Sequence, residues 1–135
     1  MEEILQKYPL LKGLNVPRET FKEFESFIVM LQKRNEEINI ISKLTARSEI
    51  IRERHIVDSA QIIDFIDLNS NIVTDIGSGG GLPGIIISIM IKNLKNSIKV
   101  NLYEKSHHKS SFLRNVSRDL KLNTEVIQKN IFETQ

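Results

Sequence analysis

The sequence lacks several features that would point to particular classes of protein. Its 135 residues include no cysteine, which excludes disulfide bonds and thiolate metal sites. No apolar run reaches the ~18 residues of a membrane-spanning helix, and the opening Met1–Glu3 lacks the basic segment that begins a signal peptide. We therefore expect a cytoplasmic protein. The net charge of +2 permits a nucleic-acid partner without requiring one.

Glycine is also scarce, and five of the six glycines fall between Val73 and Gly84. Apolar runs enter and leave this stretch, at Ile72–Ile76 and at Ile85–Ile91, and Pro83 suits the first turn of a helix. The pattern predicts a strand, a tight glycine loop and then a helix. Glycine lets the backbone approach a ligand closely, and the open N-terminus of the helix can face an anion.

Two phosphate-binding loops are the first candidates for this pattern. A P-loop needs Gly-Lys-Ser/Thr at its end, and the Leu-Pro-Gly at 82–84 excludes it. A dinucleotide-binding loop needs G-x-G-x-x-G, which Gly79, Gly81 and Gly84 formally satisfy. A nicotinamide cofactor therefore remains an alternative, as does a tight turn that binds nothing.

The third candidate is a loop for S-adenosylmethionine, which carries no phosphate. Such loops typically have an acid shortly before the first glycine, and here Asp75 stands two residues before Gly77. The end of the helix would face the carboxylate of the methionine part, and Asp75 could help to hold its ammonium group.

The remainder of the chain is read as helices followed by alternating strands and helices. Residues 1–68 are predicted to form a helical N-terminal module, with an amphipathic helix that opens at Pro17 and another helix over 48–66. Residues 69–135 are predicted to form the N-terminal half of a Rossmann-like domain. Its strands are expected at 72–76, 98–103 and 124–127, and its helices at 84–94 and 107–122.

Crossover connections of this length join parallel strands with right-handed topology. The predicted fold class is therefore α/β, with a parallel sheet that makes up half of a doubly wound fold. Nothing in the sequence is available to pair with the outer edge of the first strand, and an unpaired apolar edge favours aggregation. We expect that the sequence is a shortened version of a longer one, or that a partner covers this edge.

Candidate ligand-binding side chains follow the second predicted strand. Glu104 lies at its carboxyl end, 20 residues after Gly84, where an acid can accept both hydroxyls of an adenosine ribose. Lys105, Lys109 and Arg114 come next and are candidate RNA-binding residues, although a solvated helix face would have a similar composition. We assign no catalytic residue and expect no metal site.

Four segments together resemble one known family. They are Asp75–Gly84 with its Leu-Pro-Gly ending, Arg54–Ser59 with the pattern R-H-x-x-D-S, Asn35–Asn39, and Glu104–Val116 with the pattern E-x-x-x-x-K-x-x-F-L-x-x-V. Essentially the whole chain is similar to the ribosomal RNA small subunit methyltransferase G family, also called glucose-inhibited division protein B. Arg34 stands where that family has a tryptophan.

The resemblance implies a class I methyltransferase that transfers a methyl group from S-adenosylmethionine to guanine N7 of small-subunit (16S) ribosomal RNA. Guanine N7 has no proton to remove, which agrees with the lack of an obvious catalytic base. By position, Gly77 and Leu82 would contact the cofactor, Glu104 its ribose, and Ile131 and Phe132 its adenine. Our own interpretation of the loop adds Asp75, Gly79 and Gly81 to the candidate cofactor-binding residues.

The chain also departs from the pattern of this family. Residues 130–132 read Asn-Ile-Phe where the family usually has a segment like Arg-Ala-Glu. The family's fourth strand and its Ser-Arg-Ala motif do not occur within the 135 residues. We therefore expect these residues alone to transfer methyl groups poorly, even where they bind the cofactor.

Overall fold

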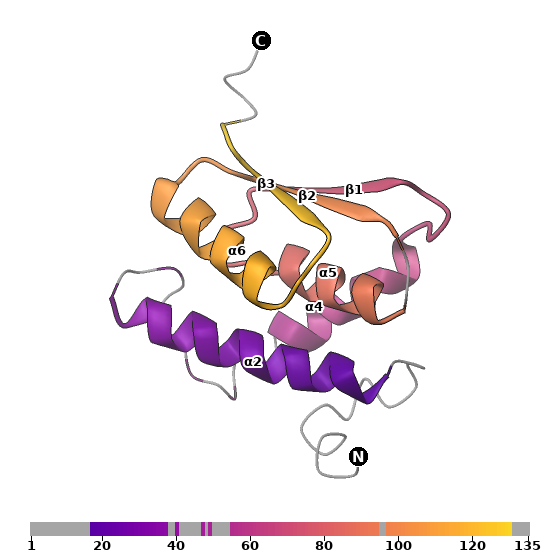
Figure 1. Cartoon of the computed structure of the whole chain (residues 1–135), viewed down its shortest axis with the longest axis horizontal. Coiled ribbons are helices and arrows are strands. Elements are labelled where there is room, and N and C mark those ends of the chain that lie inside the picture. Colours follow the sequence, from indigo (N-terminus) through magenta and orange to yellow (C-terminus); the bar gives the residue numbers. More distant parts are fainter. Residues whose placement is uncertain are drawn as a thin grey trace.

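The computed structural model describes residues 17–37, 40, 47, 49, 55–94 and 97–130 (Figure 1). Helix α2 (Arg18–Asn35) comes first, followed by the short helix α4 (Val57–Gln61) and the 3-10 helix η3 (Ile62–Phe65). The chain then alternates through β1 (Ile72–Ile76), α5 (Gly84–Asn93), β2 (Lys99–Glu104), α6 (His107–Asp119) and β3 (Thr124–Gln128). In these ranges no helix combines the length and apolar character needed to cross a membrane.

The three strands form one parallel sheet in the order β1-β2-β3. Helices α2, α4, α5 and α6 all lie on one side of this sheet, with α2 farthest from the strands (Figure 1). The predicted fold class is confirmed, because an open parallel sheet, whose strands are connected by α5 and α6, follows a helical segment. Among the described residues β1 is an edge strand, and its Ile72 and Ile76 are 53% and 54% exposed.

Helix α2 packs against the helices of the sheet through a shared core. The predicted apolar stripe is confirmed, since Phe21, Phe24, Phe27, Ile28 and Leu31 are all buried. They belong to the same hydrophobic cluster as the buried isoleucines of α5 and the inward side chains of β2 and α6. The proposed division of the chain at residues 68 and 69 stays a prediction.

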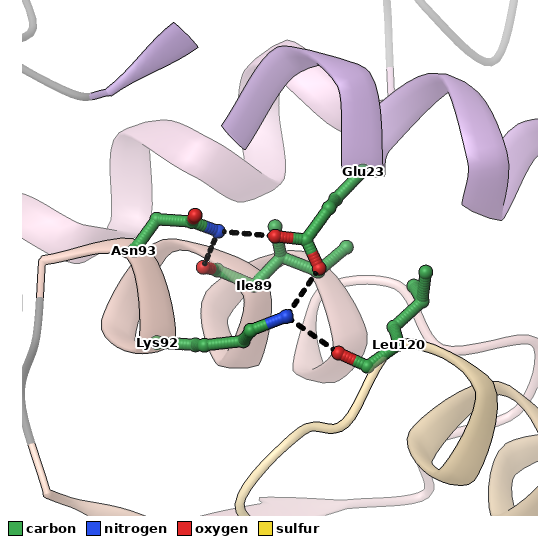
Figure 2. A network of polar contacts seen from close by, with 5 residues as sticks. All are labelled: Glu23, Ile89, Lys92, Asn93 and Leu120. Atoms are coloured by element: carbon green, nitrogen blue, oxygen red, sulfur yellow. Dashed lines mark hydrogen bonds and ion pairs between the residues drawn. The ribbon is translucent and has the colours of Figure 1, made fainter. Parts of the chain in front are cut away.

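A polar network reinforces this packing at the ends of α5 and α6 that lie away from the glycine loop. Lys92 Nζ of α5 donates to Glu23 Oε2 of α2 at 2.8 Å and to the backbone carbonyl of Leu120 at 2.6 Å (Figure 2). Asn93 Nδ2 donates to Glu23 Oε1 and to the Ile89 carbonyl, both at 2.8 Å. One carboxylate on α2 therefore fixes the position of α5, which in turn contacts the end of α6.

Two helices differ from their predicted extents. The segment predicted as a helix over 48–66 is described continuously from residue 55. In this part, helix α4 changes to the tighter 3-10 helix η3 at Ile62. Ile62 is 39% exposed, while Ile63 is buried. Helix α6 ends at Asp119 instead of continuing to 122, because Lys121 adopts a left-handed φ of 54°. The amides of Leu122 and Lys121 then donate to the carbonyls of Ser117 and Arg118, which is the Schellman arrangement of a helix C-terminus.

Candidate functional site

The glycine loop connects β1 to α5 and is fastened to the end of β2. Gly77, Gly79 and Gly81 have positive φ angles of 72°, 52° and 98°, a region that glycine enters at little cost. The amides of Gly77 and Ser78 both donate to the carbonyl of Tyr103 at 2.9 Å, and the Gly81 amide donates to the Ser78 carbonyl at 2.8 Å. The loop is therefore held by its own backbone against the neighbouring strand.

The glycines of the loop serve different needs. A Cβ atom on Gly84 would come within 2.5 Å of Leu102 Cδ2 and even closer to the Asp75 carboxylate, so Gly84 allows α5 to approach β1 and β2. A Cβ atom on Gly81 would lie 2.6 Å from Ile85 Cγ1. A Cβ atom on Gly77 would meet no atom of the described residues within 4 Å, so among them this glycine borders open space at the end of β1. Pro83 is the N-cap of α5, one residue before its predicted place in the first turn, and follows a cis peptide bond.

Glu104, the last residue of β2, is only 7% exposed although it is charged. Its Oε1 accepts from the Gly79 amide at 2.9 Å and its Oε2 accepts from the Ser106 amide at 2.8 Å. Its backbone carbonyl accepts from the Ser110 hydroxyl at 3.1 Å and from the Lys129 amide at 3.0 Å. The carboxylate therefore sits where the glycine loop, the end of β2 and the start of α6 meet.

Asp75 lies in β1 beneath the loop and is partly buried. Its Oδ2 is buried and accepts no hydrogen bond from the described residues. Burial raises the pKa of this carboxyl, the Ser78 hydroxyl and the Gly84 amide lower it to a lesser degree, and the nearby Glu104 carboxylate adds a small further increase. An unpaired buried carboxylate oxygen is costly in isolation, and a cationic partner would compensate it.

A cavity of about 200 Å³ opens at the carboxyl ends of the three strands. It is lined by Ile76, Gly77, Tyr103, Glu104, Lys105, Lys129 and Asn130. The structure thus brings the candidate residues Gly77, Glu104 and Lys105 to one cavity. Sequence reasoning missed Tyr103, Lys129 and Asn130, although ligands of open parallel sheets bind at the carboxyl ends of strands and these residues stand at or just after such ends.

A second cavity, of about 240 Å³, lies between α2 and α6 and is lined by residues such as Met30, Arg34 and Phe112. It contains none of the loop residues. Although it is somewhat larger, it is lined by residues of α2, α6 and the turn after α2 instead of the strand ends, and its Arg34 already pairs with Glu37 at 2.6 Å. We therefore place the candidate site at the strand ends, where the buried Glu104 carboxylate meets the glycine loop.

The other predicted site residues have different surroundings. The Leu82 side chain packs against the hydrophobic core, and the Lys109 amide donates to the hydroxyl of Ser106, the N-cap of α6. Arg114 is exposed, with Nη2 3.4 Å from the Val126 carbonyl. Ile131 and Phe132 lie outside the described residues. Within the described part of the chain, no three His, Asp or Glu side chains are grouped as metal ligands would be.

Comparison with known proteins gives one consistent result. The model of the family described as rRNA small subunit methyltransferase G matches residues 20–135. Over all 135 residues the chain is 78% identical to the ribosomal RNA small subunit methyltransferase G of Pelagibacter ubique strain HTCC1062, of which it covers 63%.

More distant proteins of the same name agree with this match. The chain is 38% identical over 117 residues to the one from Orientia tsutsugamushi strain Ikeda, which corresponds to 87% of this chain and 56% of that protein. It is 34% identical over 122 residues to the one from Cereibacter sphaeroides strain ATCC 17029, which corresponds to 90% and 58%. The chain therefore spans less than two thirds of the length of these relatives.

Proposed function

The chain belongs to the rRNA small subunit methyltransferase G family, and from that premise we propose that it binds S-adenosylmethionine at the carboxyl ends of its strands and serves the methylation of guanine N7 in small-subunit ribosomal RNA. The observation that carries the proposal is the pair of carboxylates beside the glycine loop. Glu104 is buried at the end of β2, and Asp75, beneath the loop, has a buried oxygen that accepts no hydrogen bond from the described part of the chain. This function would place the protein in the cytoplasm, where ribosomal subunits are found.

The hydrogen bonds of the loop support this cofactor over a dinucleotide. A pyrophosphate is bound by loop amides that point at its oxygens. Here the amides of Gly77, Ser78, Gly79 and Gly81 all donate to acceptors within the protein. The neighbouring strands instead provide carboxylates beside the loop, which suit an ammonium group near Asp75 and ribose hydroxyls near Glu104.

The reaction requires little from the protein beyond placing the methyl donor and the guanine correctly. When bound, S-adenosylmethionine supplies the methyl group on a positively charged sulfur. Guanine N7 presents a lone pair and no proton, so no general base is needed, and orientation of the reacting groups can supply much of the rate enhancement. In this chain, Asp75, the glycine loop and Glu104 would hold the donor, while the walls formed by Tyr103 and Asn130 would orient its adenosine part.

Two lysines at the cavity suggest where RNA approaches. Lys105 and Lys129 are exposed and line the cavity. The proposed cofactor carries a net positive charge, so these lysines would not favour it, whereas they would favour an RNA phosphate at the mouth of the site. Lys109 and Arg114 lie further along α6 and are proposed as secondary contacts.

The test of this function is methyl transfer to purified small ribosomal subunits, followed by mapping of the modified base. The chain is assayed alone and joined to the part of the Pelagibacter relative that lies outside the match. We expect cofactor-dependent labelling of a guanine at N7 by the joined protein and little labelling by the 135 residues alone. Labelling of another base, or none by a joined protein that binds the cofactor, would contradict the proposal.

A further inference from the structure

The Glu104 side chain accepts hydrogen bonds from the protein backbone, which the binding of a ribose alone would not require. Both of its carboxylate oxygens already accept backbone amides, Oε1 from Gly79 at 2.9 Å and Oε2 from Ser106 at 2.8 Å. Gly79 lies 25 residues earlier in the chain, in the middle of the glycine loop, and has a left-handed φ of 52°. Ser106 is the N-cap of α6, and its hydroxyl accepts from the Lys109 amide. One side chain therefore joins the glycine loop, the end of β2 and the start of α6.

We propose that Glu104 is a positioning residue that holds the glycine loop in its binding shape, in addition to the ribose-binding role that rests on the proposed function. Three other loop amides bond to backbone carbonyls, Gly77 and Ser78 to Tyr103 and Gly81 to Ser78. Among these described bonds of the loop amides, that from Gly79 is the one that joins the loop to a side chain, which belongs to β2. Because it is a hydrogen bond to a charged group, it is stronger than its neutral neighbours.

The two roles are compatible in one carboxylate. An ionised carboxyl group has about four lone-pair sites, and the Gly79 and Ser106 amides use one on each oxygen. The remaining sites can accept the two hydroxyls of a ribose. Binding of the ribose would then be linked to the shape of the loop, because both depend on the orientation of the same side chain.

The substitution Glu104→Gln separates the two roles. A glutamine amide can still form hydrogen bonds with ribose hydroxyls, through its oxygen as acceptor and its nitrogen as donor. It cannot accept from both Gly79 and Ser106, because its nitrogen would face one of these amides with a second donor. If Glu104 only binds ribose, this variant is mild and acts only on ligands with hydroxyls. If Glu104 positions the loop, binding weakens even for a ligand without them.

The experiment compares wild type with Glu104→Gln and with Glu125→Gln. Glu125 is an exposed carboxylate on β3 that pairs with Lys99, away from the loop, so it is the matched control. Amide exchange is followed by NMR for Gly79 and for Val100, whose amide bonds to the Asn123 carbonyl within the sheet. Calorimetry gives the affinities for S-adenosylhomocysteine and for its 2′,3′-dideoxy analogue.

We expect Gly79 to exchange about 10- to 100-fold faster in Glu104→Gln, the range for losing a hydrogen bond to a charged group. Val100 exchange should be unchanged, which shows that the variant folds, and both ligands should lose affinity by similar factors. Unchanged Gly79 exchange, or a loss confined to the ligand with hydroxyls, would overturn the positioning role. Failure of the wild type to bind either ligand would overturn the proposed function instead, while the exchange rates would still decide the role of Glu104 in the loop.

Discussion

Replacing single glycines of the loop by alanine should separate ligand binding from folding. Gly77 has a φ of 72° and open space where a Cβ would be, and it lines the cavity at the strand ends. Alanine there costs only the left-handed backbone, about 1–2 kcal/mol. This is small beside the ~5–15 kcal/mol of a typical domain, so Gly77→Ala should fold. Its new methyl group enters the cavity, so we expect at least a tenfold loss of cofactor affinity, about 1.4 kcal/mol or more.

Gly84 should show the opposite response. A Cβ atom there would lie 2.5 Å from Leu102 Cδ2 and would also overlap the Asp75 carboxylate, so these side chains or α5 itself have to shift. Overpacking of this kind costs about 1–3 kcal/mol, and no positive φ contributes to it. Gly84→Ala should therefore lower the free energy of unfolding more than Gly77→Ala does.

Gly79→Ala is the matched control for backbone strain in the stability measurement only, because the Gly79 amide also donates to Glu104. Its φ of 52° is also left-handed, but its Cβ would meet only the Gly77 carbonyl oxygen at 3.9 Å, and it does not line the cavity. Urea unfolding followed by circular dichroism gives the stability of each variant, and calorimetry with S-adenosylhomocysteine gives the affinity. Wild-type affinity in Gly77→Ala would refute the placement of the ligand beside this loop. A Gly84→Ala variant as stable as the wild type would refute the close approach of α5.

Charges and backbone geometry lead to four further predictions. Burial raises the pKa of Asp75, and the carboxylate takes up a proton as the pH is lowered through that pKa. The affinity for S-adenosylhomocysteine, measured by calorimetry, should therefore fall over this pH range in the wild type. It should not fall in this way in Asp75→Asn. Above that pKa the buried charge is unfavourable for folding, so Asp75→Asn should unfold at no lower urea concentration than the wild type. Glu23→Gln removes the ion pair with Lys92, whose side chain is 36% exposed. It should lower the free energy of unfolding by roughly 1–2 kcal/mol. An unchanged free energy of unfolding would show that the network of Figure 2 is not stabilising. Lys121→Gly relieves a left-handed φ of 54° at the end of α6 and should raise the midpoint of urea unfolding by an amount equivalent to about 1 kcal/mol.

The sequence predicted the parts of the fold that depend on local pattern. The strand that ends at Ile76 and the helix that begins at Gly84 were both predicted, because apolar runs meet at a glycine cluster. The end of α6 was not predicted, since the left-handed residue of its C-terminus is a lysine and not the glycine that normally marks such a position.

The site was only partly predictable for a related reason. Glu104 could be proposed from its place after a strand, but its bond to Gly79 joins residues 25 positions apart and depends on how the loop folds back over β2. Lys129 lines the cavity because β3 pairs in parallel with β2, which brings Gln128 level with Glu104. Contacts such as Glu23 with Lys92 join α2 to α5 across 69 residues, and no local pattern indicates them.

The most direct test of the central claim is a calorimetric titration of the wild-type chain with S-adenosylhomocysteine and, separately, with NAD. The Gly77, Ser78, Gly79 and Gly81 amides are already bonded within the protein, and the Glu104 carboxylate lines the cavity, so we predict saturable binding of S-adenosylhomocysteine at micromolar concentration and no heat of binding from NAD. Binding of NAD with no response to S-adenosylhomocysteine would contradict the assignment of the site.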